Sequence, residues 1–150
     1  MKRRFVLDTN VLLTRLRAMP LADDIWREFD LSGADAVLIV PSAVAAELKS
    51  IALQQGHGMR KIAQLESLLN SMTIIHTNSD IIEAYVEIDA FSQGKHPSRP
   101  LETSHRNMGK NDLWIAATAK VANATLLTFD KDFDHLSGVL LSVHRFDLNP

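Results

Sequence analysis

The chain has 150 residues, of which 46% are apolar and 23% are charged, a composition typical of a folded domain with a sizeable core. Its net charge of −2 argues against a general nucleic-acid coating protein, because such proteins are usually basic. The chain contains no cysteine, which excludes a disulfide framework and cysteine-based zinc sites and fits a reducing compartment.

The first predicted element is a short strand over 4–7, whose apolar run ends at Asp8. This run is too short for a signal peptide, which needs about 7–15 apolar residues. No other window approaches the roughly 18 apolar residues of a membrane span. We therefore expect a cytoplasmic protein that does not associate with membranes.

Helices and strands then alternate along the chain. The run over 36–40 (AVLIV) is rich in β-branched residues, which is typical of a buried parallel strand. Residues 94–110 lack apolar periodicity, so we expect a surface loop there. Helices are predicted over 11–17 (closed by Pro20), 21–31, 42–53 (ended by Gly56 and Gly58), 59–72, 79–91 (capped by Asn78 or Ser79) and 112–122 (capped by Asn111). Further strands are predicted over 73–77, 124–129 and 137–143.

This alternation predicts an α/β fold, with a parallel sheet and helices on both faces, formed by a single domain over 1–150. Ligands of such sheets bind beyond the carboxyl ends of the strands. Asp8 and Asp130 are predicted at strand carboxyl ends. Glu47 lies on the helix after the second strand, and Asp112 lies in the first turn of a helix entered from the same edge.

Four carboxylates at one edge repel one another and cost free energy unless a positive group lies between them. Mg²⁺ or Mn²⁺ suits a site made only of oxygen ligands, so the pattern favours a metal-dependent hydrolase that cleaves phosphodiesters. Each acid alone also has a structural explanation, as a helix cap, a solvated helix position, a first-turn residue or a turn former. The six histidines have no zinc-binding spacing, which disfavours zinc.

Polar residues close to these acids are candidates for organising the site. Thr9 and Asn10 follow Asp8, and Thr128 precedes Asp130 by two positions, so their side chains can return to the acids. Helix capping and strand packing are the alternative roles for these residues.

The loop over 94–110 is rich in basic residues, and these are candidates for binding a phosphate backbone. They are Lys95, Arg99, Arg106 and Lys110. Asn111 directly precedes Asp112 and is a further candidate for organising the acids.

Four segments together resemble the PIN-domain family, and within it the VapC-type toxins of toxin–antitoxin pairs. They are LDTNVLL, AAELK on the helix after the second strand, NDLWIAATA and LLTFDKDF. The ordered set is fairly specific, and the resemblance covers essentially the whole chain. It implies a three-layer α/β/α PIN-like fold around a central, mainly parallel sheet of about five strands.

The resemblance also implies a site and an activity. The family's four acids bind one or two Mg²⁺ or Mn²⁺ ions, and in this sequence they correspond to Asp8, Glu47, Asp112 and Asp130, with Asp132 competing for the fourth position. Asn10 and Thr128 correspond to polar residues that organise the site. The implied activity is endoribonucleolytic cleavage, often of tRNA or rRNA. The implied partners are the RNA substrate, a cognate antitoxin protein and a second copy of the chain in a homodimer.

Two other functions are consistent with parts of the sequence. A phosphatase of the haloacid-dehalogenase type also places an aspartate after the first strand, but it needs a second aspartate where this chain has Asn10. A non-catalytic RNA- or protein-binding module on the same fold is expected to lack the acids, all of which are present. The apolar stripe of helix 59–72 fits an antitoxin, a second protomer or core packing: Met59, Ile62, Leu65, Leu69 and Met72.

Overall fold

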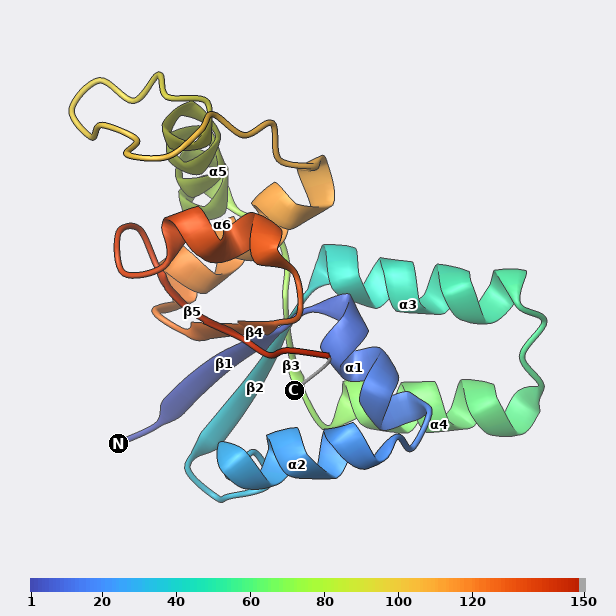
Figure 1. The fold of residues 1–150 in the computed structure, drawn as a ribbon. Helices are drawn as coiled ribbons and strands as arrows, with labels where there is room; N and C mark the ends of the chain where they lie inside the picture. The colour runs from blue at the N-terminus through green and yellow to red at the C-terminus, as the bar shows by residue number, and fades with distance from the viewer. Residues whose placement is uncertain (149–150) are drawn as a thin grey trace.

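The computed structural model describes residues 1–148 and contains a five-stranded, all-parallel β-sheet flanked by helices (Figure 1). The strands lie in the order β3-β2-β1-β4-β5, which confirms the predicted α/β class. Their bounds are β1 Arg3–Leu7, β2 Ala36–Pro41, β3 Thr73–Ile75, β4 Thr125–Thr128 and β5 Ser142–Arg145.

Strand β1 occupies the centre of the sheet. Its residues 5–7 are apolar and buried, as a strand covered on both faces requires. It pairs in parallel with β2 on one side and with β4 on the other. The pairing continues one residue beyond β1, where the Asp8 N–H donates to the Leu127 carbonyl at 3.1 Å. The chain therefore leaves β1 at the same edge of the sheet at which β4 ends.

The helices cover both faces of this sheet. Figure 1 shows α5 and α6 above the sheet and α2 below it. Their bounds are α1 Thr9–Leu16, α2 Pro20–Glu28, α3 Ser42–Gln54, α4 Met59–Asn70, α5 Ser79–Ser92 and α6 Lys110–Ala122, followed by the 3₁₀ helix η1 Lys131–Leu136. Within residues 1–148, no helix combines the length and the apolar character needed to cross a membrane.

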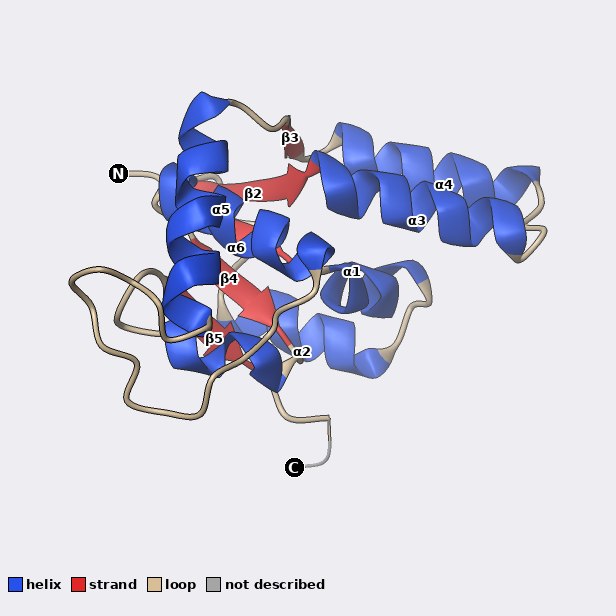
Figure 2. Ribbon diagram, turned by 90° about the horizontal axis from the view of Figure 1, so that it is seen from above, coloured by secondary structure: helices blue, strands red, loops and turns tan. Residues whose placement is uncertain are grey.

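Helices α3 and α4 form a hairpin that projects beyond the sheet (Figure 2). Leu48 on α3 and Leu65 and Leu69 on α4 are buried and form the inner part of the hairpin. At the far end, Met59 is 90% exposed and Ile62 is 43% exposed. The predicted apolar stripe is therefore core in its second half and exposed in its first half.

Two predictions about helix ends are wrong. Pro20 does not close the first helix, because α1 ends at Leu16 and Pro20 is the first residue of α2. Proline is favoured there since that position has no intrahelical partner for an N–H. Asn111 does not cap α6, because the cap is Gly109 and the helix already includes Lys110. The predicted cap Asn78 is confirmed, since its Oδ1 accepts the Ile81 N–H at 3.0 Å.

The last strand lies further along the chain than predicted. The prediction was 137–143, but β5 spans Ser142–Arg145. The chain turns at Gly138, whose φ is +73°, and the Gly138 N–H donates to the Leu141 carbonyl. Val139 and Leu140 therefore lie in a turn and Leu141 forms an isolated bridge with Ser137, which apolar character alone does not distinguish from a strand.

Candidate metal centre

Asp8 lies directly after β1 and is only 6% exposed. Its Oδ1 accepts the Thr9 N–H at 2.8 Å, which caps α1, and its Oδ2 accepts the Thr128 hydroxyl at 2.7 Å. Asp8 is thus the N-cap of α1, one of the structural roles expected for the acids from the sequence. The cap and the threonine together fix the carboxylate, and each oxygen keeps acceptor capacity for a further ligand.

Thr128 connects Asp8 to the segment that follows β4. Its hydroxyl donates to Asp8 and accepts the Asp130 N–H at 3.0 Å. Asp130 then caps η1, because its Oδ1 accepts the Asp132 N–H at 2.9 Å. A single buried hydroxyl therefore sets the position of one strand-end acid relative to another.

Glu47 lies on α3 and is half-buried. Its Oε2 accepts the Thr9 hydroxyl at 2.8 Å. Thr9 therefore contacts two of the predicted acids, Asp8 through its backbone and Glu47 through its side chain. This contact orients the Glu47 carboxylate. Glu47 is therefore not simply a solvated residue on the surface of α3.

Three carboxylates lie close enough to share one ion. Asp112 from the first turn of α6, together with Asp130 and Asp132, offers oxygens that all lie within 4.8 Å of one another. Mg²⁺ and Ca²⁺ bind oxygens at about 2.0–2.6 Å, so two ligands of one ion lie no more than about 5 Å apart. The donor set therefore fits a hard divalent cation. Asp8 and Glu47 are not part of this triplet.

The charges of all five acids nevertheless act on one another. Burial, as the largest cause, and the charges of Asp8, Asp130, Asp132 and Glu47 together raise the pKa of Asp112 to about 6. Burial also raises the pKa of Asp8, against the opposing effect of its hydrogen bonds from Thr128 and Thr9. A cation between these carboxylates would relieve both effects.

The four basic residues proposed to bind a phosphate backbone have different surroundings in the structure. Arg106 reaches the acids, with its Nη1 3.7 Å from Asp132 Oδ1. Lys110 is exposed on the first turn of α6, two residues before Asp112. Arg99 instead points to the Val139 carbonyl, at 3.5 Å. Lys95 is exposed just beyond the end of α5.

Two predicted site residues make no side-chain hydrogen bond to the acids within residues 1–148. The side chains of Asn10 and Asn111 are exposed, and neither makes a hydrogen bond to another residue within 1–148. Asn111 faces solvent because Gly109 takes the capping position that was assigned to it.

Sequence reasoning missed a contact between the end of α5 and η1. The Ser92 hydroxyl is 2.7 Å from His135 Nε2 and 3.3 Å from Met108 Sδ, and Ser92 is fully buried. His135 belongs to η1, which also carries Asp132. No local pattern identifies this pair because Ser92 and His135 lie 43 positions apart.

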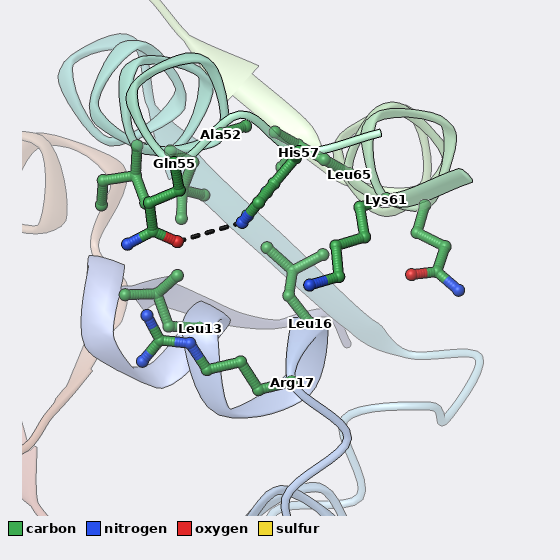
Figure 3. Close-up of a pocket in the computed structure, with 11 residues that line it drawn as sticks. Leu13, Leu16, Arg17, Ala52, Gln55, His57, Lys61 and Leu65 are labelled. Atoms are coloured by element: carbon green, nitrogen blue, oxygen red, sulfur yellow. Dashed lines mark hydrogen bonds between the residues drawn. The ribbon is translucent and has the colours of Figure 1, made fainter. Parts of the chain in front are cut away.

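A separate cavity of about 140 Å³ lies between α1 and the α3–α4 hairpin (Figure 3). Its wall is apolar at Leu13, Leu16 and Leu65 and basic at Arg17 and Lys61. The acids described above do not line it. It is thus a second surface feature, distinct from the carboxylate edge.

The fold and the acid-lined edge define a PIN domain, and a sequence model of that family matches residues 5–139. The chain therefore belongs to the PIN-domain family. Within that family it is a distant homologue of VapC ribonucleases. Ribonuclease VapC2 of Rickettsia felis (strain ATCC VR-1525 / URRWXCal2) is 27% identical over 138 residues, which cover 91% of this chain and 95% of the relative.

Solved structures share the fold. VapBC2 from Rickettsia felis, bound to a DNA fragment from its promoter, superimposes with a TM-score of 0.74 at 21% identity, over 96% of this chain and 99% of the other. A toxin–antitoxin complex from Klebsiella pneumoniae gives a TM-score of 0.68 at 18% identity, over 95% and 98% of the two chains. At these identities the likeness establishes the fold.

Proposed function

We propose that this protein is a Mg²⁺- or Mn²⁺-dependent endoribonuclease, the toxin of a toxin–antitoxin pair, which hydrolyses phosphodiester bonds of tRNA or rRNA. The observation that carries the proposal is the oxygen triplet of Asp112, Asp130 and Asp132 beside the buried Asp8. Homology to a VapC ribonuclease supports RNA as the substrate. The Thr9 contact of Glu47 supports a role for the fifth acid.

The triplet would hold the ion, and Asp8, which lies outside the triplet but close to it, would supply a further ligand, with Glu47 available for a second ion or for orienting the attacking water. When bound there, a divalent ion supplies charge neutralisation at the phosphate and lowers the pKa of a coordinated water. Hydrolysis by water leaves a 3′-hydroxyl and a 5′-phosphate.

The chain's own residues hold these groups in place. Thr128 and Thr9 fix the two oxygens of Asp8, so that its carboxylate does not have to reorganise during the reaction. Lys95, Arg99, Arg106 and Lys110 are proposed to bind the RNA backbone. Each contact between an exposed cation and a phosphate adds to the affinity, and this contribution decreases as the salt concentration rises.

The test is cleavage of total RNA and of tRNA by the purified chain in Mg²⁺, in Mn²⁺ and in EDTA, beside Asp8→Asn. The Asn side chain keeps the shape of Asp8 but removes its charge. Discrete fragments that need both the metal and Asp8 support the proposal. Cleavage by Asp8→Asn at the wild-type rate contradicts it, and so does the absence of cleavage by folded, antitoxin-free protein.

We also propose that a cognate antitoxin binds between α1 and the α3–α4 hairpin. The cavity there joins apolar walls to Arg17 and Lys61 (Figure 3), and Leu53, Met59 and Ile62 are exposed on the same hairpin. This combination suits an amphipathic segment with acidic residues.

Co-expression with the product of the neighbouring gene tests this surface. Leu16→Asp and Ile62→Asp are expected to abolish co-purification, while Val139→Asp, an exposed apolar residue in the turn before β5, is expected to preserve it. Loss with all three variants, or with none, contradicts the placement. We further propose that the toxin is a homodimer, which sedimentation equilibrium tests directly.

A further inference from the structure

The loop between α5 and α6 returns to the acid edge at Arg106. The Arg106 side chain is 38% exposed, and its Nη1 lies 3.7 Å from Asp132 Oδ1. Of the basic residues of this loop, Arg106 is the one that forms an ion pair with a member of the oxygen triplet within residues 1–148. Its guanidinium therefore lies beside the carboxylates rather than on a distant part of the loop.

The backbone of Arg106 is firmly anchored. Its N–H donates to the Ser92 carbonyl at 2.7 Å, and two residues later Met108 is buried against the Ser92 hydroxyl. The same hydroxyl meets His135 of η1, the helix that carries Asp132. The backbone of Arg106 and η1, which carries Asp132, therefore meet at Ser92, and this fixes the Arg106 backbone relative to Asp132.

The contact with Asp132 leaves most of the guanidinium unused. The Asp132 side chain is 55% exposed, and ion pairs of such groups contribute little stability. Within residues 1–148, the Arg106 Nε is buried and has no hydrogen-bond partner. A guanidinium offers five donors in a planar fork that matches a phosphate. The buried Nε cannot reach a phosphate, so the donors that remain for one belong to the two Nη nitrogens beside Asp132.

We propose that Arg106 is a catalytic residue that donates hydrogen bonds to the non-bridging oxygens of the phosphate being cleaved. This inference rests on the proposed ribonuclease function. The scissile phosphate must approach the triplet, so a guanidinium that already lies beside Asp132 meets that phosphate. Negative charge grows on the phosphoryl group during water attack, and a fixed cation there lowers the barrier rather than only the dissociation constant.

The remaining basic residues of the loop then have a different role. Arg99 donates to the Val139 carbonyl and Lys95 is exposed beyond the end of α5, and within residues 1–148 neither forms a hydrogen bond or ion pair with the triplet. Loss of a flanking contact weakens binding, whereas loss of Arg106 slows the chemical step. The two roles are separated by comparing kcat with KM.

The experiment measures kcat and KM of the full chain on a short RNA that contains the mapped cleavage site. Arg106→Gln is compared with Arg106→Lys and with Arg60→Gln, which removes an exposed arginine from α4. Thermal unfolding of each variant is recorded in parallel. We expect Arg106→Gln to lower kcat about 10²–10³-fold, as for loss of one preorganised donor, with a much smaller change in KM. Arg106→Lys is expected to recover part of kcat, and Arg60→Gln to match the wild type.

A wild-type kcat in Arg106→Gln overturns the inference while leaving the ribonuclease proposal intact. A rise in KM with unchanged kcat also overturns it, because that result makes Arg106 a flanking contact. If Arg106→Gln does not fold, the folded Arg106→Lys variant decides: a wild-type kcat overturns the inference, and a lower kcat with little change in KM supports it. If the wild type itself cleaves no RNA, both proposals fail.

Discussion

The Thr128 hydroxyl donates a 2.7 Å hydrogen bond to Asp8 Oδ2 and so joins two residues that are 120 positions apart in the chain. Thr128 is fully buried, and its oxygen also accepts the Asp130 N–H. The carboxyl ends of β1 and β4 are therefore connected by side chains as well as by the strand pairing. The arrangement of the acids depends directly on this contact.

Thr128→Val is expected to destabilise the fold and weaken metal binding. Valine has the same shape but leaves the Asp8 carboxylate without its buried donor, a loss of about 1.5–3 kcal/mol for a hydrogen bond to a charged group. Urea denaturation measures the stability change, and Mg²⁺ titration measures the affinity. Thr125→Val, at the exposed start of β4, serves as the control and is expected to change neither. Equal stability of the two variants would contradict this account.

Mg²⁺ is expected to stabilise the folded protein through the triplet. A free Mg²⁺ concentration of about 100 times Kd adds about 2.7 kcal/mol to the free energy of unfolding. Asp130→Asn is expected to remove most of this shift and Asp132→Asn less of it, because Asp132 is more exposed and is paired with Arg106. Thermal unfolding with and without Mg²⁺ measures the shift. Asp134→Asn, on the same 3₁₀ helix but paired with Arg145, is the control and should keep the full shift.

The metal-free protein is expected to lose stability as pH rises from about 4 to about 6. The pKa of Asp112 is about 6 in the folded protein, against 3.8 for the ordinary group. In this window the folded state binds more protons than the unfolded state, so stability falls with increasing pH. Urea denaturation in EDTA across this range should show a shallower fall for Asp112→Asn than for the wild type. Identical slopes for the two proteins would contradict the charge coupling.

Ser92→Ala is expected to destabilise the protein by about 1–3 kcal/mol, because it leaves the part-buried ring of His135 without a partner at Nε2. It should also slow RNA cleavage, since the Arg106 segment and η1 meet at this residue. Ser142→Ala removes an exposed hydroxyl and is the control for both measurements. Slow cleavage by a Ser92→Ala variant of unchanged stability would contradict the structural part of this prediction.

Much of the carboxylate edge could be predicted because its signals are local. Asp8 and Asp130 follow apolar runs that form strands, and Asp112 opens a helix, so the parallel sheet brings them to one edge. Their roles as ligands and the RNA substrate stay predictions. The identity of the metal ion also stays a prediction.

Other features depend on contacts that no local pattern encodes. Asp132 reaches the triplet through the turn of η1, whose first residues are capped by the hydrogen bond from the Asp132 N–H to Asp130 Oδ1. Gly109 rather than Asn111 caps α6, since the backbone path out of the loop decides where the helix starts. Ser92 and His135 meet only after α5 and η1 have packed.

The strand order has a consequence for synthesis of the protein. The first strand is central, but its neighbour β4 is made only after most of the chain, and Asp8 meets Thr128 and Asp130 only when β4 is in place. A nascent chain on the ribosome therefore carries Asp8 and Glu47 without the other half of the acid edge. For the ribonuclease proposed above, this order of synthesis means that the carboxylate edge stays incomplete until β4 has been made and has paired with β1.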